Sequence, residues 1–218
     1  AIVPDERGAP TKRFMPVRVA GTVGVSPRSV DLNPMEIRIG ASHVTARGRV
    51  ALDGASDLRL DGQVADAPAI ARVFALPPVQ GGDATLQARA IGPAGALRFD
   101  AKLALERTVV AGNRLGGADL QIQGTYGREL AVSGAVSARQ VQTAVATVDE
   151  FSTPFAYRAP AAKPGAGSLN LAAIAVRMGK GGLAGKASFA PGTKRYTVDL
   201  KSAGIAITVR TSGRLSAA

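Results

Sequence analysis

The sequence contains no cysteine, no tryptophan and a single histidine, and each of these absences removes a class of function. Without cysteine the chain has no disulfide framework and no thiolate metal site. A Ser-His-Asp or Cys-His catalytic arrangement, or a histidine-rich metal centre, would depend on His43 alone. His43 directly precedes an alternating segment, so we expect it on the polar face of a strand. The sequence therefore predicts a protein that is not an enzyme, with no cofactor and no bound metal.

The acidic residues and glycine-rich segments do not restore a catalytic or nucleotide site. Asp53, Asp57 and Asp61 recur around an expected hairpin, but the terminal Glu of a calcium loop is missing. The segment 179–188 contains Gly-Lys, yet Ala187 occupies the position where a phosphate loop needs a magnesium-binding Ser or Thr. We expect turn and polar-face residues in the first case, and a hairpin turn in the second.

Aromatic residues are also scarce, with six Phe and three Tyr among 218 residues. Since aromatic side chains supply much of the buried area of a closed core, we expect a thin core or an apolar face that is not fully covered. No run approaches the roughly 18 apolar residues of a membrane-spanning helix. The chain opens AIVPDERGAP, without an initiator Met or a signal-peptide pattern. We expect an internal piece of a longer protein, with any anchor outside it.

Positive charge is abundant but unevenly distributed. Residues 1–157 carry 17 Lys and Arg against 15 Asp and Glu, a net charge of 17 − 15 = +2, whereas residues 158–218 carry 10 against 1, a net of +9. The change coincides with a Pro/Gly/Ala-rich stretch at 158–167, which we interpret as a linker between a segment 1–157 and a basic β segment 168–218. Such a tail suits an acidic partner, or it reflects an arginine-rich composition without a specific role. Nucleic acid is disfavoured because stacking aromatics are almost absent and no helix is available to enter a groove.

Strict alternation of apolar and polar residues dominates the chain, as at Leu97, Phe99, Leu103 and Leu105. This period of two is typical of strands with one apolar and one wet face. Short turn signals separate the segments, which predicts roughly fourteen strands in a mostly antiparallel meander. One interruption, at 66–78, predicts a short helix near 67–75. The expected fold class is all-β.

Four segments repeat the pattern apolar-x-apolar-x-Gly-x-Val, at 17–23, 44–50, 58–64 and 130–136. In each one the glycine lies on the apolar face. A glycine inside a strand marks a bend or a close approach, so four in the same phase would let the sheet curl into an apolar trough. On periodicity alone, the relief of crowding in an ordinary sandwich explains the glycines slightly better.

The strand pattern resembles the TamB/AsmA-like family of bacterial envelope proteins, the repeating β-groove proteins. The resemblance includes strands that end in Leu-x-Gly or Ile-x-Gly, at 60–62 and 122–124. It also includes the Ala-Pro-rich interruption at 66–82, followed by a Gly-led strand and Gly-Pro at 92–93. It covers residues 17–150 well and 168–218 less specifically.

The resemblance implies an elongated, twisted, U-shaped groove that carries phospholipid across the periplasm between the inner and outer membranes, contributing to outer-membrane biogenesis. It implies anchoring to the inner membrane by a segment absent from this chain, and an outer-membrane barrel partner of the TamA/BamA kind. About fourteen strands would extend roughly 65 Å. The residues expected to line the groove are Val44, Val50, Leu52, Leu58, Leu60, Gly62, Val64, Leu97, Phe99, Leu103, Leu120, Ile122, Leu130, Val132, Gly134 and Val136. Lys180, Lys186, Lys194 and Arg195 are expected to contact headgroups or a partner.

Two other hypotheses for the fold and function remain open at this point. One is a β-sandwich or β-solenoid binding or scaffold module, including a chaperone-like role in outer-membrane protein assembly. The other is a β-helical carbohydrate enzyme, which the lack of clustered carboxylates and aromatic sugar platforms disfavours.

Overall fold

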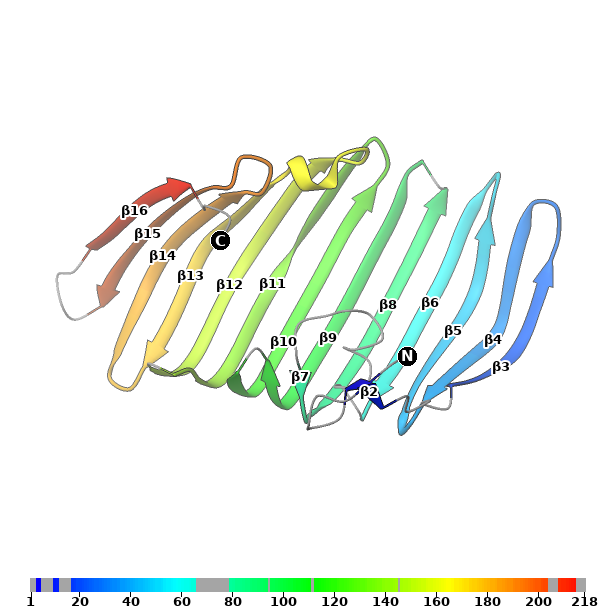
Figure 1. The fold of residues 1–218 in the computed structure, drawn as a ribbon. Helices are drawn as coiled ribbons and strands as arrows, with labels where there is room; N and C mark the ends of the chain where they lie inside the picture. Colours follow the sequence, from blue (N-terminus) through cyan, green and yellow to red (C-terminus); the bar gives the residue numbers. More distant parts are fainter. Residues whose placement is uncertain are drawn as a thin grey trace.

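A single open antiparallel sheet accounts for nearly all of the described chain (Figure 1). The computed structural model describes residues 17–65, 79–93, 95–110, 112–144, 146–203 and 208–214, together with two-residue strands at 3–4 and 10–11. Thirteen strands lie side by side in sequence order, from β3 at one edge to β16 at the other, and the short β7 pairs with β9. Every pairing is antiparallel.

The strands of the first part of the sheet are β3 (Val17–Val25), β4 (Ser29–Ile39), β5 (Ser42–Ala51), β6 (Ala55–Val64), β7 (Val79–Gln80) and β8 (Asp83–Pro93). Those of the second part are β9 (Leu97–Val110), β10 (Asn113–Tyr126), β11 (Glu129–Gln142), β12 (Thr147–Pro160), β13 (Ser168–Met178), β14 (Gly181–Ala190), β15 (Arg195–Ala203) and β16 (Thr208–Arg214). A separate pair, β1 (Val3–Pro4) and β2 (Pro10–Thr11), precedes them.

This architecture confirms the all-β, antiparallel fold expected from alternation. A sandwich needs a second sheet facing the first, and a solenoid needs parallel strands. The described residues form one antiparallel sheet, which is not closed into a barrel, so neither alternative architecture is observed in them. The short helix expected near 67–75 falls outside the described residues.

The segment expected to be a linker, 158–167, connects two neighbouring strands of this sheet. β12 extends to Pro160, a 3₁₀ turn follows at Pro164–Ala166, and β13 then returns beside β12. The Tyr157 hydroxyl donates a hydrogen bond to the carbonyl of Pro164, which ties the turn to the strand. The basic residues that follow therefore belong to the same sheet as the rest of the chain.

A crease crosses the four central strands at one level. Each strand contributes one residue that is omitted from the cross-strand register: Arg107 in β9, Gly116 in β10, Gln140 in β11 and Asp149 in β12. Arg107 and Gln140 adopt the left-handed backbone region, with φ of 49° and 52°, a conformation that costs an L-residue about 1–2 kcal/mol. The omission is matched on the two strands of each pair, so pairing resumes in the same register instead of shifting as it does at a β-bulge. Because the irregularity lies at one level in four adjacent strands, it folds the sheet along a line.

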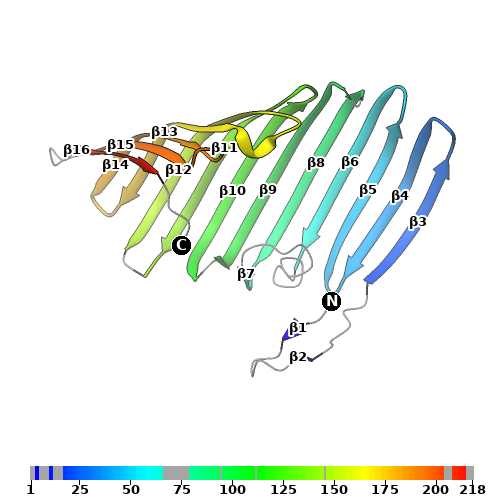
Figure 2. The same cartoon turned by 45° about the horizontal axis from the view of Figure 1, so that its top comes forward.

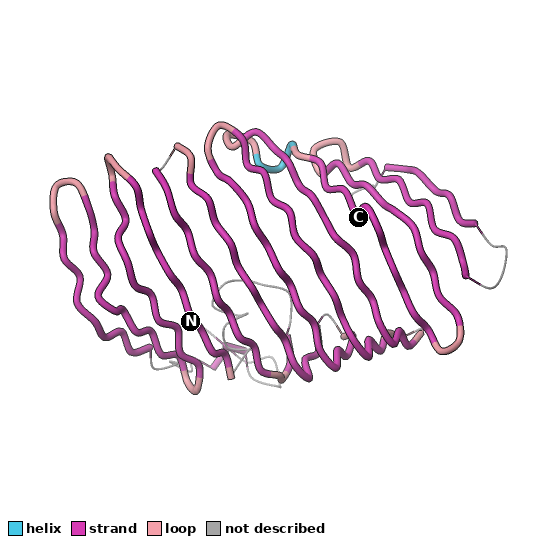
Figure 3. The backbone as a smooth tube through the Cα atoms, turned by 180° about the vertical axis from the view of Figure 1, so that it is seen from behind, coloured by secondary structure: helices cyan, strands magenta, loops and turns pink. Residues whose placement is uncertain are grey.

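The crease also preserves the separation of the two faces. Apolar residues lie three positions apart across it, as in Leu115–Ala118 and Ala138–Val141, instead of two. The omitted residue resets the alternation, so the apolar side chains stay on one face as the strand turns. In Figure 3 the lower parts of these central strands are seen nearly end-on, which is where the crease lies. Figure 2 shows a further turn of the sheet, because β13 to β16 are viewed almost along their edges.

Candidate functional site

Cross-strand register places the apolar residues of successive strands in rows that cross the sheet. Residues paired in register share a face, since side chains alternate along each strand. One row runs through Val44, Gly62, Leu86, Leu103, Leu120 and Val136, each directly opposite the next. The next row runs through Ala46, Leu60, Ala88, Ala101, Ile122, Gly134, Phe155 and Leu171. The result is one continuous apolar face, which we take as the candidate functional site.

Fifteen of the sixteen residues predicted to line a groove lie on this apolar face. Two further pairings of the register, Val30↔Val50 and Tyr126↔Leu130, place the outermost predicted residues there as well. Leu52 is the exception. β5 ends at Ala51, and Leu52 lies in the following turn, where it is 68% exposed and its N–H bonds the carbonyl of Arg28. The prediction from the sequence extended the alternating pattern of this strand one residue beyond the end of β5.

The same face includes residues that were not assigned to the groove from the sequence. These additional residues include Leu86, Leu105, Phe151, Phe155, Tyr157, Leu169, Leu171, Ile174, Val176, Leu183, Phe189, Val198 and Leu200. Their period-two spacing was a sufficient signal. Those after residue 157 were missed because the change in charge there directed attention to the basic residues of that segment.

Side chains on the apolar face are half-buried rather than packed. Among the described apolar residues only Ile39, Ala84 and Ala159 are buried, and two of these are alanines. Apart from β12 with its adjoining 3₁₀ turn, every described pair of elements in substantial contact is a pair of neighbouring strands. No second layer covers either face within the described part of the chain. The apolar face is thus a broad surface without the tight packing of a protein core.

Two glycines of the apolar face, Gly134 of a repeated segment and Gly124, lie where a neighbour needs the space of a missing side chain. A Cβ on Gly134 would lie 1.9 Å from the carbonyl oxygen of Gln121 and 2.9 Å from the ring of Phe155. A Cβ on Gly124 would lie 2.6 Å from the ring of Phe99. Both glycines therefore receive the ring of a directly paired residue on the next strand. This confirms the close approach expected for Gly134.

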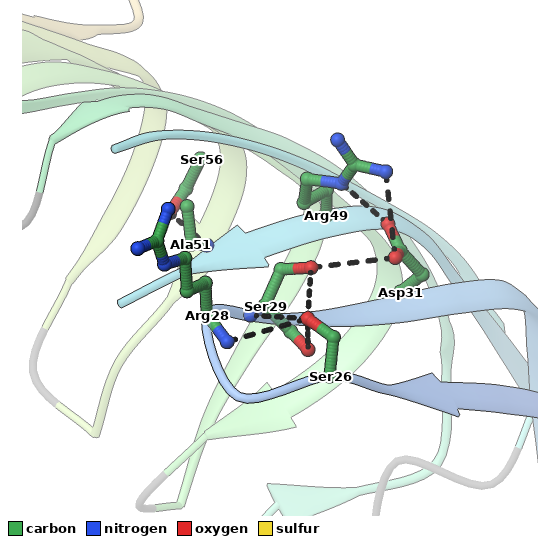
Figure 4. A network of polar contacts seen from close by, with 7 residues as sticks. All are labelled: Ser26, Arg28, Ser29, Asp31, Arg49, Ala51 and Ser56. Carbon is green, nitrogen blue, oxygen red and sulfur yellow. Dashed lines mark hydrogen bonds and ion pairs between the residues drawn. The ribbon is translucent and has the colours of Figure 1, made fainter. Parts of the chain in front are cut away.

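The opposite face is polar, and ion pairs cross it between strands. Arg49 contacts Asp31 at 2.6 Å and Arg89 contacts Asp57 at 2.8 Å, in both cases with exposed side chains. Figure 4 shows the first of these pairs, with Ser29 also contacting the Asp31 carboxylate. Exposed pairs of this kind contribute little to stability, about 0–1 kcal/mol each.

Hydrogen bonds across these pairs account for the described pKa shifts. The guanidinium of Arg89 lowers the pKa of the Asp57 carboxyl by hydrogen bonding, and the charges of Arg89 and Arg59 add to this effect. The pKa values of Arg49 and Arg89 are raised by their hydrogen bonds to the two carboxylates. These shifts have structural causes and indicate no catalytic group.

The four basic residues expected to contact headgroups do not form one patch. Lys180 lies in the turn between β13 and β14, whereas Lys194 and Arg195 lie at the turn between β14 and β15. These turns are at opposite ends of β14, a ten-residue strand that spans roughly 33 Å. Lys186 is between them on the polar face, opposite Asp199.

Other candidate groups are dispersed over the polar face. His43 lies in register with Arg38 and Gln63 on that face and is exposed. No group of three or more His, Asp or Glu side chains is placed to hold a metal ion in the described residues. The Gly-Lys segment forms the hairpin between β13 and β14.

None of the described helices is long and apolar enough to span a membrane. Comparison of the chain with protein-family models, with curated proteins and with solved structures gives no match.

Proposed function

We propose that this chain carries phospholipid, holding acyl chains along the continuous apolar face of its sheet. The observation that carries the proposal is the extent of that face. It crosses twelve strands, from β3 to β15, without a described layer above it, and most of its Leu, Ile, Val and Phe side chains between β4 and β15 are half-buried. Eleven strand spacings of about 4.8 Å give the surface a length of roughly 53 Å.

The physical chemistry of an acyl chain favours a surface of this kind. Each methylene removed from water contributes about 0.8 kcal/mol, so a carrier gains most from an apolar path without polar interruptions. Rows of paired Leu, Val, Ile and Ala supply such a path along the hydrogen-bonding direction of the sheet, from strand to strand. A headgroup can stay hydrated at the open side of the face, because no described element closes over it.

The resemblance to TamB/AsmA-like proteins extends this proposal to a biological setting. In that setting the chain is part of a periplasmic bridge between the inner and outer membranes, anchored at the inner membrane. Its partner is an outer-membrane barrel protein of the TamA/BamA kind, and the role is a contribution to outer-membrane biogenesis. The open sheet and the basic residues of β13–β15 are compatible with this setting.

Photo-crosslinking from the two faces tests lipid binding directly. A benzophenone amino acid at Leu103 lies on the apolar face, and the same group at Lys102 lies on the polar face one residue away. After expression in bacteria, the proposal predicts phospholipid adducts from position 103 and few from position 102. Equal labelling at both positions, or none at either, would argue against a lipid path.

A second candidate function, chaperone-like binding of unfolded outer-membrane proteins, is favoured by one observation at the sheet edge. β3 has a described partner only on its β4 side, and its valines Val17, Val19, Val23 and Val25 are 44% to 78% exposed. An exposed apolar edge strand is a template for an added strand. This function predicts saturable binding of a peptide with alternating apolar residues, weakened by Val19→Lys with Val23→Lys. An unchanged affinity in that double variant would remove it.

A further inference from the structure

On the polar face, three arginines occupy directly opposed positions on adjacent strands. Arg47 of β5 pairs with Arg59 of β6, and Arg59 pairs with Arg89 of β8. Side chains opposed in this way have Cβ atoms about 4.5–5.5 Å apart, and like charges at that spacing destabilise a sheet. The arrangement therefore needs compensation from acidic groups or from a bound anion.

The nearby carboxylates compensate only part of this charge. Asp31 receives two contacts from Arg49, at 2.6 and 3.4 Å, and Asp57 receives two from Arg89, at 3.1 and 2.8 Å. Both carboxylates are thus occupied by one guanidinium each. Within the described part of the chain, Arg47 and Arg59 have neither an ion pair nor a hydrogen bond.

These six charged side chains line one open hollow of about 680 Å³ on the polar face. Four arginines and two aspartates give it a formal charge of 4 − 2 = +2. The hydrogen bonds from Arg89 hold the pKa of Asp57 below its ordinary value, so the Asp57 carboxylate stays ionised near neutral pH. The excess belongs to Arg47 and Arg59, which are both exposed to solvent.

We propose that this hollow is an anion site in which Arg47 and Arg59 bind a phosphoryl group. A guanidinium presents a planar fork of N–H donors that matches two oxygens of an oxyanion. Two adjacent forks need three or four acceptor oxygens, which a phosphoryl group supplies and a single carboxylate does not. Bound phosphate also removes the repulsion between the two arginines.

The site is independent of the proposed lipid path, because it lies on the opposite face of the sheet. Leu58 and Leu60, which flank Arg59 in β6, point to the apolar face. An acyl chain on that face cannot bring its headgroup through the sheet to Arg59. The phosphoryl group comes from solution or from a phospholipid headgroup presented to the polar face.

Calorimetric titration with inorganic pyrophosphate at low ionic strength tests the site. The wild-type protein should show one saturable site, and Arg47→Ala with Arg59→Ala should weaken it by about tenfold or more, as expected for the loss of charged hydrogen bonds. Lys180→Ala with Lys194→Ala removes the same charge elsewhere in the fold and should leave the affinity unchanged. Equal weakening in the two double variants, or no saturable binding by the wild type, would overturn the proposal.

Two further measurements sharpen the result. Without phosphate, the Arg47→Ala, Arg59→Ala protein should melt at the same temperature as the wild type or slightly higher, since a repulsion is lost. With pyrophosphate only the wild type should gain in melting temperature.

A parallel titration with short-chain phosphatidic acid below its micelle concentration distinguishes the two sources of the phosphoryl group, a lipid headgroup and free phosphate. Tighter binding than pyrophosphate identifies a lipid headgroup, and equal or weaker binding identifies free phosphate. A wild-type melting temperature unmoved by either ligand would contradict the site.

Discussion

The first half of the sheet, β3 to β8, and the second half, β9 to β16, share one apolar face but differ in the side chains on both of its faces. In the first half the apolar face is made of Val, Leu, Ile, Met and Ala, whereas all seven described aromatic residues belong to β9–β15. The polar face of the first half carries several ion pairs, such as Arg49–Asp31 and Arg89–Asp57. Beyond β11 the described ion pair is Arg177–Glu150. The same apolar alternation is therefore compatible with aliphatic or aromatic side chains on one face and with many or few ion pairs on the other.

Gly134 in the aromatic half should be harder to replace than Gly62 in the aliphatic half. A Cβ on Gly134 would meet the backbone of β10 at 1.9 Å, whereas a Cβ on Gly62 first meets a methyl group of Val44 at 3.2 Å. A backbone cannot give way as a side-chain methyl can. We expect Gly134→Ala to lower the free energy of unfolding by about 2–4 kcal/mol, and Gly62→Ala by about 1 kcal/mol or less.

Urea denaturation of the two variants measures this difference. Gly165→Ala is a control in the 3₁₀ turn, because no heavy atom lies within 4 Å of its Cβ position. Equal losses of unfolding free energy in Gly134→Ala and Gly62→Ala would mean that the two halves of the sheet pack alike around these glycines.

The charge difference predicts a difference in membrane binding. Basic residues near an anionic surface contribute about 1 kcal/mol each. Since Lys180 lies at the opposite end of β14 from Lys194 and Arg195, one membrane plane reaches about two of the four predicted residues. We expect the combined neutralisation of Lys180, Lys186, Lys194 and Arg195 to weaken binding to anionic vesicles by about 2 kcal/mol. Added salt should have a similar effect.

Vesicle sedimentation at several salt concentrations makes the measurement. Neutralising four arginines of the first half that are each paired with an acid is the matched comparison: Arg28, Arg38, Arg49 and Arg89. The basic second half has no special role in membrane binding if both sets of changes weaken it equally, or if neutral vesicles bind as well as anionic ones.

The crease belongs to the second half, and β6 ends at Val64, opposite Ala84, before the level of the crease is reached. Gln140 holds a left-handed conformation there, which glycine adopts without strain. Gln140→Gly should therefore stabilise the protein by about 1 kcal/mol. Gln123→Gly, in the regular part of β10, should destabilise it by a similar amount. Thermal unfolding of the two variants distinguishes them, and a loss of stability in both would show that Gln140 is not strained.

The smallest expected effect concerns pH and the first half. The folded-state pKa of Asp57 is lowered by Arg89. The contribution of Asp57 to stability is therefore complete above the unfolded-state pKa of about 4. It disappears as the pH falls through the lower folded-state pKa. The difference in melting temperature between wild type and Asp57→Asn should be small at pH 7 and vanish near pH 2. A difference that grows on acidification would contradict the assigned cause.

Strand positions and the identity of the apolar face were predictable because each depends only on local alternation. Leu58, Leu60 and Val64, for example, share a face whatever the partner strand is. The end of β5 was not predictable, because Leu52 begins the turn to β6 although its N–H still bonds the carbonyl of Arg28, the residue before β4. That contact is non-local.

The crease could not be found strand by strand. A three-residue spacing such as Ala138–Val141 is ordinary in one strand, and it acquires meaning only when three neighbouring strands repeat it at the same level. The same reasoning applies to the glycines. Their need for space comes from atoms of the neighbouring strands, as with the Gln121 carbonyl and the Phe155 ring around Gly134, and these contacts require register. Arg47 and Arg59 also come together only through register.

The most direct test of the central claim compares neighbouring residues on the two faces. Val132→Arg and Leu120→Asp place a charge on the apolar face, and Ser133→Arg and Gln121→Asp place the same charges one residue away on the polar face. Desolvating an unpaired charge beside an acyl chain is costly, but an uncovered face lets the protein fold with it. Lipid transfer between vesicles should fall in the first pair only, while all four variants keep a wild-type circular dichroism spectrum and melting temperature. If the two apolar-face variants unfold, or if they fold and transfer lipid normally, the apolar face does not carry lipid.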